Sequence, residues 1–474
     1  MSDSKNIFEG VKKIHLIGIG GIGMSGIAEY LVKREYKVSG SDIAASPVTR
    51  RLEKLMVKFS AGHDEKNLPD DADLVIYSSA VNEDNAELLK AKKLEMQIVK
   101  RAEALGNIVN DKFVIAVSGT HGKTTTTAMI AKILLDSRVD PTVFVGGNIE
   151  FLDGGSSRIG NSNIAVVEAD EYDRSFLQLK ADLIVITNID ADHLDIYKDV
   201  EDIKSNFKKF IENSKKNVRI IGCGDEKNVM DILKDLKNKI TYGFKNSNSN
   251  TIEDVSFDKN SIGYRINNAD IRIKVLGKHN ILNSAAAYLT ASQLNIDNEV
   301  INESMKTFFG VRRRLELKFD NGIKIYDDYA HHPTEVRASL DAIRKINPSR
   351  VITVFQPHLY TRTKDFYKEF AEAFSGTDML MLAKIYPARE KEIKGVSSEL
   401  ILNEYNNAIN KPVQGKEIKL EGYYIDDNEK ILNLLESITK EGDVIIFQGA
   451  GDITELCEKF VKRVKVKLNW MVPL

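Results

Sequence analysis

Short apolar runs alternate with stretches of helical periodicity through most of the chain. This alternation predicts an α/β fold with mainly parallel sheets, because strands that alternate with helices are usually joined by crossovers. Strands are predicted at residues 13–17, 37–39, 74–78, 112–118, 164–168, 183–187, 218–222, 323–326, 350–355, 379–383 and 444–447. Helices are predicted at residues 24–34, 124–137, 277–293, 333–346 and 363–374.

The chain is long enough for several domains, since its 474 residues exceed the size at which a single core stops growing. A run of Asn and Ser at residues 246–250 predicts a surface turn, and the alternation after it favours a small antiparallel part. The strand and helix pattern starts again after Arg314. We therefore expect three domains, at residues 1–107, 108–314 and 315–474.

Composition narrows the classes of partner. The chain is 42% hydrophobic and 29% charged, and its net charge is −2. This balance gives no general attraction to nucleic acid or to an anionic membrane, so small molecules are the expected partners. Cys223 and Cys457 are far apart and indicate neither a disulfide framework nor a zinc site. The N-terminus is polar and glycines interrupt the apolar stretch after it, so we expect a cytoplasmic protein without a signal peptide or spanning helix.

The first of two glycine-rich loops, residues 18–23 (the first glycine loop), matches the pattern G-x-G-x-x-G between a predicted strand and helix. Asp42 follows the next predicted strand. By itself this is a dinucleotide fingerprint, which would indicate an NAD-dependent dehydrogenase or a nucleotide-binding module. Glycines kept for tight packing are a second alternative. The loop requires only a pyrophosphate, so a nucleoside-diphosphate sugar would satisfy it equally well.

The second loop, residues 119–124 (the second glycine loop), also lies between a predicted strand and helix. Such a loop directs backbone N–H groups and a helix N-terminus at phosphate oxygens. We expect Lys123 to neutralise phosphate charge and the Thr124 hydroxyl to bind Mg²⁺. The spacing departs from G-x-x-x-x-G-K-[ST], because position 117 is Val. A glycine-rich turn without a nucleotide is the alternative, but the four threonines at residues 124–127 argue against it.

Polar residues at the ends of two further predicted strands are candidate metal ligands. Glu168 ends one strand and Asp170 follows it, while His193 lies in the polar segment after the next strand. The carboxyl ends of parallel strands face ligands, and Mg²⁺ prefers hard oxygen ligands. For any one of these side chains a solvated loop or a helix cap is an equal alternative. Their shared position after neighbouring strands nevertheless favours a metal site.

Further motifs occur in order along nearly the whole chain, at residues 18–26, 78–81, 118–126, 145–148, 168–173, 187–193, 277–283, 327–335, 355–358 and 449–452. Together with the two glycine loops they resemble the Mur ligases, the ATP-dependent amide-forming enzymes of peptidoglycan synthesis. The resemblance implies an N-terminal Rossmann-like domain that binds a UDP-sugar and a central P-loop ATPase-type domain. It also implies a C-terminal Rossmann-like domain that closes over ATP and admits an amino acid.

The resemblance implies that the lactyl carboxylate of UDP-N-acetylmuramate attacks the γ-phosphate of ATP, and that L-alanine then displaces phosphate from the acyl phosphate. Residues 20–26 favour this activity over that of the ligase that attaches a recovered tripeptide to the same UDP-sugar. Two anions must meet, so charge neutralisation is the largest expected catalytic effect. The implied catalytic residues are Lys123, Glu168 and His193, and Thr124, Glu168 and His193 are implied ligands of two Mg²⁺ ions. A monomer and a homodimer are both compatible with the sequence.

The resemblance also implies three sets of binding residues. The ATP-binding residues are Gly119, Thr120, His121, Gly122, Lys123, Thr124, Thr125, His279, Asn280, Asn283, Arg314 and Asp328. The UDP-sugar-binding residues are Gly18, Gly20, Gly21, Gly23, Met24, Ser25, Asp42, His63 and Ser79. The amino-acid-binding residues are Tyr329, His331, His358 and Arg362, of which Arg362 could hold a carboxylate with its guanidinium fork.

Two features depart from the family pattern. Position 359 is Leu where many relatives carry Arg, so one charged contact is absent or is supplied by another residue. Several Mur ligases carry a carbamylated lysine near the second magnesium. Lys204 and Lys208 lie in roughly the corresponding part of this sequence, but neither aligns convincingly with that lysine, and we do not predict that modification.

Overall fold

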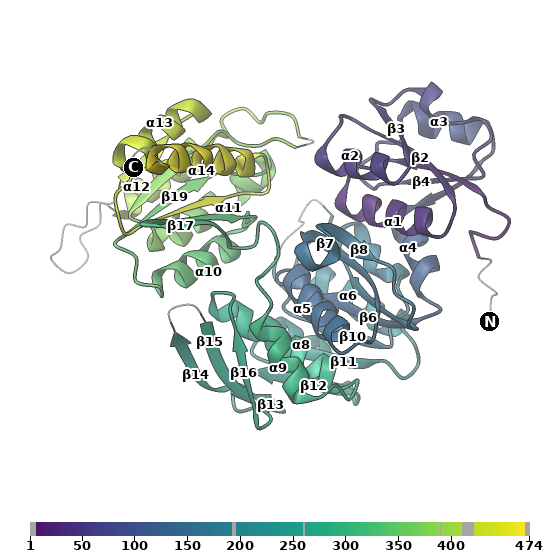
Figure 1. Cartoon of the computed structure of the whole chain (residues 1–474), viewed down its shortest axis with the longest axis horizontal. Helices are drawn as coiled ribbons and strands as arrows, with labels where there is room; N and C mark the ends of the chain where they lie inside the picture. The colour runs from purple at the N-terminus through teal and green to yellow at the C-terminus, as the bar shows by residue number, and fades with distance from the viewer. Residues whose placement is uncertain (1–5, 192–195, 259–260, 389, 410–420, 470–474) are drawn as a thin grey trace. The chain divides into compact units, whose positions relative to one another are not determined.

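The computed structural model describes residues 6–191, 196–258, 261–388, 390–409 and 421–469 (Figure 1). Its contacts divide the chain into two compact units. The first unit extends to Phe309 without the short segments 258–261 and 275–280, and these segments belong to the second unit together with the chain from Gly310 onward. The boundary expected near residue 107 thus falls within the first unit. Among the described residues, no helix is long and apolar enough to cross a membrane.

The N-terminal part of the first unit is a five-stranded parallel sheet of order β3-β2-β1-β4-β5. Its strands are β1 (Lys13–Ile17), β2 (Lys37–Asp42), β3 (Lys58–Ala61), β4 (Leu74–Tyr77) and β5 (Gln97–Lys100). Its helices are α1 (Ile22–Lys33), α2 (Pro47–Lys54), α3 (Ala86–Lys93) and α4 (Arg101–Val109). The strand order reverses between β1 and β4, which is the point where open α/β sheets bind ligands. The first glycine loop follows β1 at this point.

The central part of the first unit is an eight-stranded sheet of order β13-β12-β11-β10-β6-β9-β7-β8, in which only the β7–β8 pair is antiparallel. Its strands are β6 (Phe113–Ser118), β7 (Thr142–Ile149), β8 (Gly155–Arg158), β9 (Ile164–Glu168), β10 (Leu183–Ile186), β11 (Arg219–Cys223), β12 (Lys239–Gly243) and β13 (Asn250–Thr251). Its helices are α5 (Lys123–Asp136), α6 (Val200–Asn213) and α7 (Lys227–Leu233). The second glycine loop follows β6, which lies between β10 and β9.

One cluster of buried apolar side chains joins the two sheets of the first unit. It includes Ile27 of α1 and Phe144 of β7. The rings of Tyr30 and Phe144 lie 6.0 Å apart, and Ser156 of β8 donates a hydrogen bond to the Ile22 carbonyl (3.0 Å). The helix that follows the first glycine loop is therefore packed directly on the sheet that carries the second.

A three-stranded antiparallel sheet follows, with β14 (Glu253–Asp258), β15 (Ser261–Ile266) and β16 (Ala269–Ile273). Buried and exposed residues alternate along β16, as expected for a strand with one face on the core. Helices α8 (Lys278–Ser292) and α9 (Asn298–Lys306) come next. The small antiparallel part predicted from the sequence is confirmed.

The second unit is a six-stranded sheet of order β17-β18-β22-β19-β20-β21. Its strands are β17 (Glu316–Asn321), β18 (Ile323–Asp328), β19 (Arg350–Phe355), β20 (Met379–Leu382), β21 (Glu421–Tyr424) and β22 (Asp443–Gln448), and only β17 is antiparallel to its neighbour. Successive side chains of β19 face opposite cores: Val351 and Phe355 pack on one side, Ile352 and Val354 on the other. Helices α10 (Pro333–Arg344), α11 (Tyr360–Ala373) and α12 (Glu399–Ile409) cover the first side; α13 (Asn428–Ile438) and α14 (Ile453–Asn469) cover the second (Figure 1).

The mainly parallel α/β fold is therefore confirmed. The predicted strands all overlap observed ones, but β3, β5, β7, β8, β12, β13, β17 and β21 were not predicted. Cys223 and Cys457 are free and buried, in agreement with the absence of a cysteine signature in the sequence.

Candidate active site

The second glycine loop is held in its conformation by polar residues that follow β10. Thr187 Oγ1 donates to the His121 carbonyl (2.6 Å), and the Asn188 side chain contacts both the His121 N–H (2.8 Å) and the His121 carbonyl (3.0 Å). Thr120 Oγ1 accepts from the Asp190 N–H (2.9 Å). The segment from which we predicted a metal ligand thus anchors the loop.

Two glycines of this loop leave no room for a side chain. A Cβ on Gly119, which has φ +132°, would lie 2.1 Å from Thr187 Oγ1. A Cβ on Gly122, with φ +83°, would lie 2.5 Å from the Oδ1 of Asn283 in α8. Glycine is therefore required at both positions, for conformation and for space. Asn283, one of the implied ATP-binding residues, thus lies beside the loop within the first unit.

Thr124 and Glu168 lie together at the carboxyl edge of the central sheet. The Thr124 hydroxyl donates to Glu168 Oε1 (2.9 Å), and the Gly146 N–H donates to Glu168 Oε2 (2.6 Å). They meet because Glu168 ends β9, the strand beside β6. Burial raises the pKa of Glu168 above its ordinary value, although Lys123 and these hydrogen bonds oppose the shift. The site contains a partly buried carboxylate that an added cation would stabilise in its charged form.

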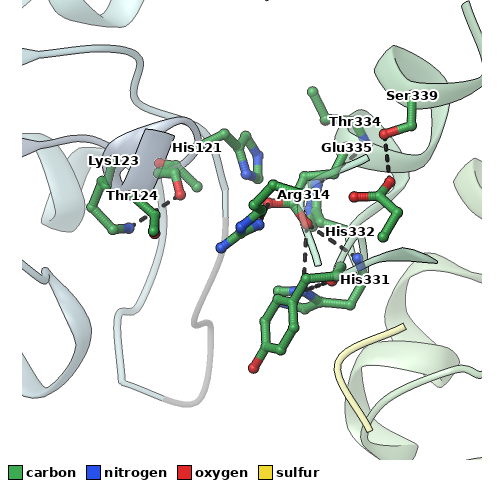
Figure 2. Close-up of polar contacts among 12 residues, drawn as sticks. His121, Lys123, Thr124, Arg314, His331, His332, Thr334, Glu335 and Ser339 are labelled. Carbon is green, nitrogen blue, oxygen red and sulfur yellow. Dashed lines mark hydrogen bonds and ion pairs between the residues drawn. The ribbon is translucent and has the colours of Figure 1, made fainter. Parts of the chain in front are cut away.

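Glu171 is a residue of this site that the sequence reasoning missed. The Lys123 ammonium donates to both of its carboxylate oxygens (2.9 and 2.8 Å) and to the carbonyls of Gly119 (2.8 Å) and Thr120 (3.2 Å). Burial raises the pKa of Glu171 to about 7, against the lowering effect of Lys123. Burial would lower the pKa of Lys123, but the carboxylates of Glu171, Asp170 and Glu168 outweigh it and raise the pKa above its ordinary value. Lys123 is therefore charged and aligned along the loop (Figure 2).

The residues named for the second metal ion and for its surroundings are His193, Lys204 and Lys208. His193 lies outside the described residues. Lys204 is buried and bonded to Asp231 (2.8 Å) and Glu201 (2.9 Å), and the contact with Asp231 raises its pKa. Lys204 is thus held by two carboxylates. Lys208 is exposed on α6.

The first glycine loop borders two cavities of the first unit. One, of about 510 Å³, is lined by Gly18, Gly20, Asp42 and His63, among others. The other, of about 330 Å³, is lined by Gly23, Met24, Ser79 and Arg101 and extends to Glu168 and Asp170. Both cavities include Gly21 and Ser78. The cavity of about 330 Å³ thus extends from the first glycine loop to Glu168, whose carboxylate contacts Thr124 of the second glycine loop.

Two of the residues predicted to bind the UDP-sugar are engaged in holding the first loop and its helix. Asp42 Oδ2 accepts from the Gly20 N–H (2.7 Å), so its carboxylate fixes the loop. The Ser25 hydroxyl donates to the Ile22 carbonyl within α1 (2.9 Å) and is buried, and Ser25 lines neither cavity. The structure thus brings Asp42 to the cavity and directs the Ser25 side chain into its own helix.

A buried acid lies behind His63. Glu87 of α3 has no exposed side-chain surface and contacts His63 Nδ1 (2.9 Å), His15 Nε2 (2.7 Å) and the Ser41 hydroxyl (2.7 Å). Burial favours its neutral form, but the hydrogen bonds from His15, Ser41 and His63 outweigh it and keep the pKa of Glu87 below its ordinary value. His63 is therefore positioned by a charged partner, with 23% of its side chain exposed at the cavity.

In the second unit, Glu335 links two of the predicted site residues. It lies 3.8 Å from the Arg314 guanidinium and 3.4 Å from His331 Nδ1, and it accepts from the His331 N–H (3.1 Å) (Figure 2). Arg314 also stacks over the Tyr329 ring at 5.0 Å. Glu335 occupies the first turn of α10, where an acid interacts favourably with the helix dipole. The sequence reasoning had assigned it no role.

The four residues predicted to bind the amino acid gather in this unit. The His331 ring lies 5.3 Å from Tyr329 and 5.9 Å from His358, and Arg362 Nη1 is 3.5 Å from His358 Nδ1. His358 stacks on Tyr386 at 5.7 Å, a contact that the sequence did not indicate. These side chains form one cluster of rings with the Arg362 guanidinium beside it.

Other predicted residues of the second unit have internal partners. Asp328 is buried and accepts from Ser339 (2.6 Å), Gln448 (3.1 Å) and the Leu315 N–H (3.1 Å), and burial raises its pKa. Its carboxylate therefore orients the segment next to Arg314. Asn280 donates to the Leu276 carbonyl (2.7 Å), and His279 lies beside Gly277. Leu359 is buried at the start of α11 with φ +71°.

The arrangement can hold phosphate at two helix N-termini of one unit, with a partly buried carboxylate between them. Family models match the chain in the same order: the Mur ligase family catalytic domain at residues 13–113, the Mur ligase middle domain at 117–291 and the Mur ligase glutamate ligase domain at 313–451. The chain belongs to the Mur ligase family.

Individual relatives are similar over nearly the whole chain. A UDP-N-acetylmuramate–L-alanine ligase of Acetivibrio thermocellus is 44% identical over 463 residues, which cover 95% of this chain and 96% of that protein. The crystal structure of a UDP-N-acetylmuramate–alanine ligase from Thermotoga maritima is 29% identical, with a TM-score of 0.82 over 96% of this chain and 99% of that one. A murein peptide ligase from Psychrobacter arcticus has a TM-score of 0.70 over 95% and 98% of the two chains; at 23% identity it shows the shared fold alone.

Proposed function

We propose that the chain is an ATP-dependent ligase that joins L-alanine to the lactyl carboxylate of UDP-N-acetylmuramate in peptidoglycan precursor synthesis. The observation that carries the proposal is the 44% identity, over 95% of the chain, to a curated ligase named for that reaction. In the first step a carboxylate oxygen bonds to the γ-phosphorus of ATP and ADP leaves. In the second step the alanine nitrogen bonds to the acyl carbon and phosphate leaves.

The two cavities of the first unit support a binding mode for the UDP-sugar. A nucleoside beside Asp42 and His63 would have its diphosphate at Gly21, where the cavities meet at the start of α1. The sugar would then extend through the second cavity toward Glu168. This direction brings the lactyl carboxylate toward the second glycine loop, as an attack on ATP requires.

The donor set around Thr124 fits a magnesium ion. The hydroxyl of Thr124 and the carboxylate of Glu168 are hard oxygen ligands, and Asp170 lines the same cavity. A Mg²⁺ held by Thr124 and Glu168 would neutralise phosphate charge. Lys123 would add a second positive charge by exchanging its contact with Glu171 for phosphate oxygens. A second ion at His193 remains part of the proposal.

We assign the remaining roles by the same reasoning. Within the second unit, Tyr329, His331, His358 and Arg362 would bind alanine, and the Arg362 guanidinium suits its carboxylate. His279, Asn280, Asn283 and Arg314 would bind the nucleotide of ATP, while Asp328 would position Arg314. We also propose a cytoplasmic protein, monomeric or homodimeric, with domain boundaries after residues 107 and 314.

Phosphate release from ATP tests the proposed function. The expected result is release that requires UDP-N-acetylmuramate, L-alanine and Mg²⁺ together, with ADP and an alanylated UDP-sugar as products detected by mass spectrometry. Turnover with the tripeptide L-alanyl-γ-D-glutamyl-meso-diaminopimelate and none with L-alanine would refute it in favour of the tripeptide ligase. A panel of alanine, glycine and serine measures selectivity, since a methyl-sized difference provides only about 1–3 kcal/mol.

A further inference from the structure

Arg101 is a charged residue of the second cavity that no part of the proposed mechanism uses. It is the first residue of α4, directly after β5, and its side chain is half-buried. It lines the cavity of about 330 Å³ together with Gly21, Gly23 and Glu168. An arginine guanidinium stays protonated at any pH at which a protein is folded. The cavity therefore contains a permanent positive charge.

This charge has no acidic partner among the residues that the structure describes. The polar contact of the Arg101 guanidinium is with Ser175 Oγ, at 3.5 Å. Glu168 and Asp170 line the same cavity but do not pair with it. The neighbouring Lys100, by contrast, pairs with Asp173, and Arg51 pairs with Glu29. A partly buried guanidinium without a carboxylate, in a cavity, is an arrangement that an anionic ligand would complete.

Gly23 explains how the guanidinium reaches the start of α1. A Cβ added at Gly23 would lie 3.0 Å from Arg101 Nη1 and 3.2 Å from its Cδ. The third glycine of the loop therefore makes room for the Arg101 side chain. In a dinucleotide fingerprint the same glycine allows close packing of helix and strand. Here it brings a cation to the helix end where the proposed diphosphate binds.

We propose that Arg101 binds the diphosphate of the UDP-sugar, at the phosphate that carries the sugar. This inference rests on the proposed function. The cavity of about 510 Å³, which we propose for the nucleoside, and the cavity of about 330 Å³, which we propose for the sugar, meet at Gly21. Arg101 lines the cavity of about 330 Å³, beside Gly23, and so lies on the sugar side of Gly21. The bound diphosphate would accept hydrogen bonds from the N-terminus of α1 on one side and from the guanidinium on the other. Arg101 is thus a substrate-binding residue that lies 78 positions after Gly23 in the sequence.

Calorimetric binding of three probes tests this assignment. UDP and UDP-N-acetylglucosamine contain the diphosphate without the lactyl carboxylate, and UDP-N-acetylmuramate contains both. Arg101→Met keeps the apolar stem and is expected to weaken binding of all three probes by about 10- to 100-fold. Arg101→Lys retains the positive charge but not the guanidinium fork, so its affinity for each probe should lie between those of Arg101→Met and the wild type. Gly23→Ala should also weaken all three, because its Cβ displaces the guanidinium.

The controls separate a binding role from a structural one. Arg50→Ala removes an exposed arginine of α2 and should leave all three affinities unchanged. Thermal unfolding of each variant reports folding, and Arg101→Lys keeps the test informative if Arg101→Met unfolds. Kinetically, Arg101→Met should raise the KM for the UDP-sugar and leave the KM for ATP near the wild-type value.

Two results would overturn the assignment. One is binding of UDP to folded Arg101→Met within about twofold of the wild type, less than loss of one charged hydrogen bond would give. The other is a loss confined to UDP-N-acetylmuramate, which would move the contact to the lactyl carboxylate. The failure of the proposed function is separate, because it appears as absent turnover by the wild type with L-alanine, whatever the affinity of the variants for UDP.

Discussion

The two glycine loops of the first unit have the same local design but obtain their positive charge differently. Each follows a buried strand and leads into a helix whose N–H groups can face phosphate. The second glycine loop contains its own cation, Lys123, whose ammonium donates to the Gly119 carbonyl. The first glycine loop has no basic residue, and the nearest guanidinium comes from Arg101 at the start of α4. A loop sequence therefore reports a phosphate site but not always the charge that completes it.

The acids near the two loops also differ, in the direction in which their pKa values are shifted. Glu87 lies behind His63, which lines the cavity of about 510 Å³; it receives hydrogen bonds from three side chains, and its pKa is lowered. Glu168 and Glu171, beside the second glycine loop, have raised pKa values because burial outweighs the groups that compensate them. The first acid is satisfied by the protein alone. The other two are in an environment that an added cation would stabilise, as expected where ATP and a metal bind.

The largest expected effect comes from the cation of the second loop. Lys123→Ala should lower turnover by about 10³-fold, because it removes a charge that faces the transferred phosphate. Binding of UDP, measured by calorimetry, should be unchanged, since the first loop is intact. Lys132→Ala, on the same helix and paired with Asp136, is the matched control. Near-normal turnover of Lys123→Ala would show that the phosphate role assigned to Lys123 is wrong.

Glu168→Gln should separate activity from stability. Turnover at a fixed Mg²⁺ concentration is expected to fall by about 10²-fold, and half-saturation should require more Mg²⁺. The melting temperature without Mg²⁺ should stay the same or rise. An acid whose pKa is raised in the folded state destabilises that state once the pH exceeds its unfolded pKa, and glutamine carries no charge. Glu150→Gln, an exposed neighbour of β7, is the control. Unchanged Mg²⁺ dependence would exclude Glu168 as a ligand.

A pair of glycine substitutions tests how tightly each loop is enclosed. Gly122→Ala introduces a Cβ 2.5 Å from Asn283 Oδ1 at a positive φ, and should reduce the free energy of unfolding by about 1–3 kcal/mol and raise the KM for ATP. Gly21→Ala has φ −63° and its nearest atom at 3.5 Å, so its stability should change by less than about 0.5 kcal/mol. Its Cβ enters the cavities, so UDP should bind more weakly. Urea denaturation measures the stability of the two variants, and calorimetry measures their affinity for UDP. Equal destabilisation by the two substitutions would contradict the predicted difference between the loops.

Glu87→Gln has the smallest expected effect on turnover and a definite pH dependence. At pH 7 it should lower the free energy of unfolding by about 1–3 kcal/mol, because buried partners lose a charged acceptor. Since the folded-state pKa of Glu87 is below its ordinary value of 4.5, its stabilisation is complete above that pH and is lost as the pH falls through the lower folded-state value. Chemical denaturation at pH 7 and near pH 4 should therefore give a smaller difference at the lower pH. A constant difference would mean that packing, not charge, is responsible; Glu103→Gln, exposed on α4, is the control.

Most strands that lie between two neighbours were predictable, although β7 and β12 were missed, and several edge strands were not predictable. β1, β6, β19 and β22 lie between two neighbours and are mostly buried and apolar. β3, the edge strand Lys58–Ala61, is partly exposed along its length, and its residues show no apolar run. Mixed burial weakens the periodic signal on which prediction depends. The antiparallel part was predictable because buried and exposed residues alternate along β16, which has one face on the core.

The sequence by itself determined the two glycine loops and the mainly parallel α/β architecture. These features depend on short-range order, namely glycines, a lysine and apolar runs at fixed spacing. Only the tertiary structure placed Glu171 on Lys123, Glu87 behind His63, Glu335 between Arg314 and His331, and Arg101 beside Gly23. These side chains carry no motif of their own. Their partners are set by strand order and helix packing, which bring together charges that are distant in the chain.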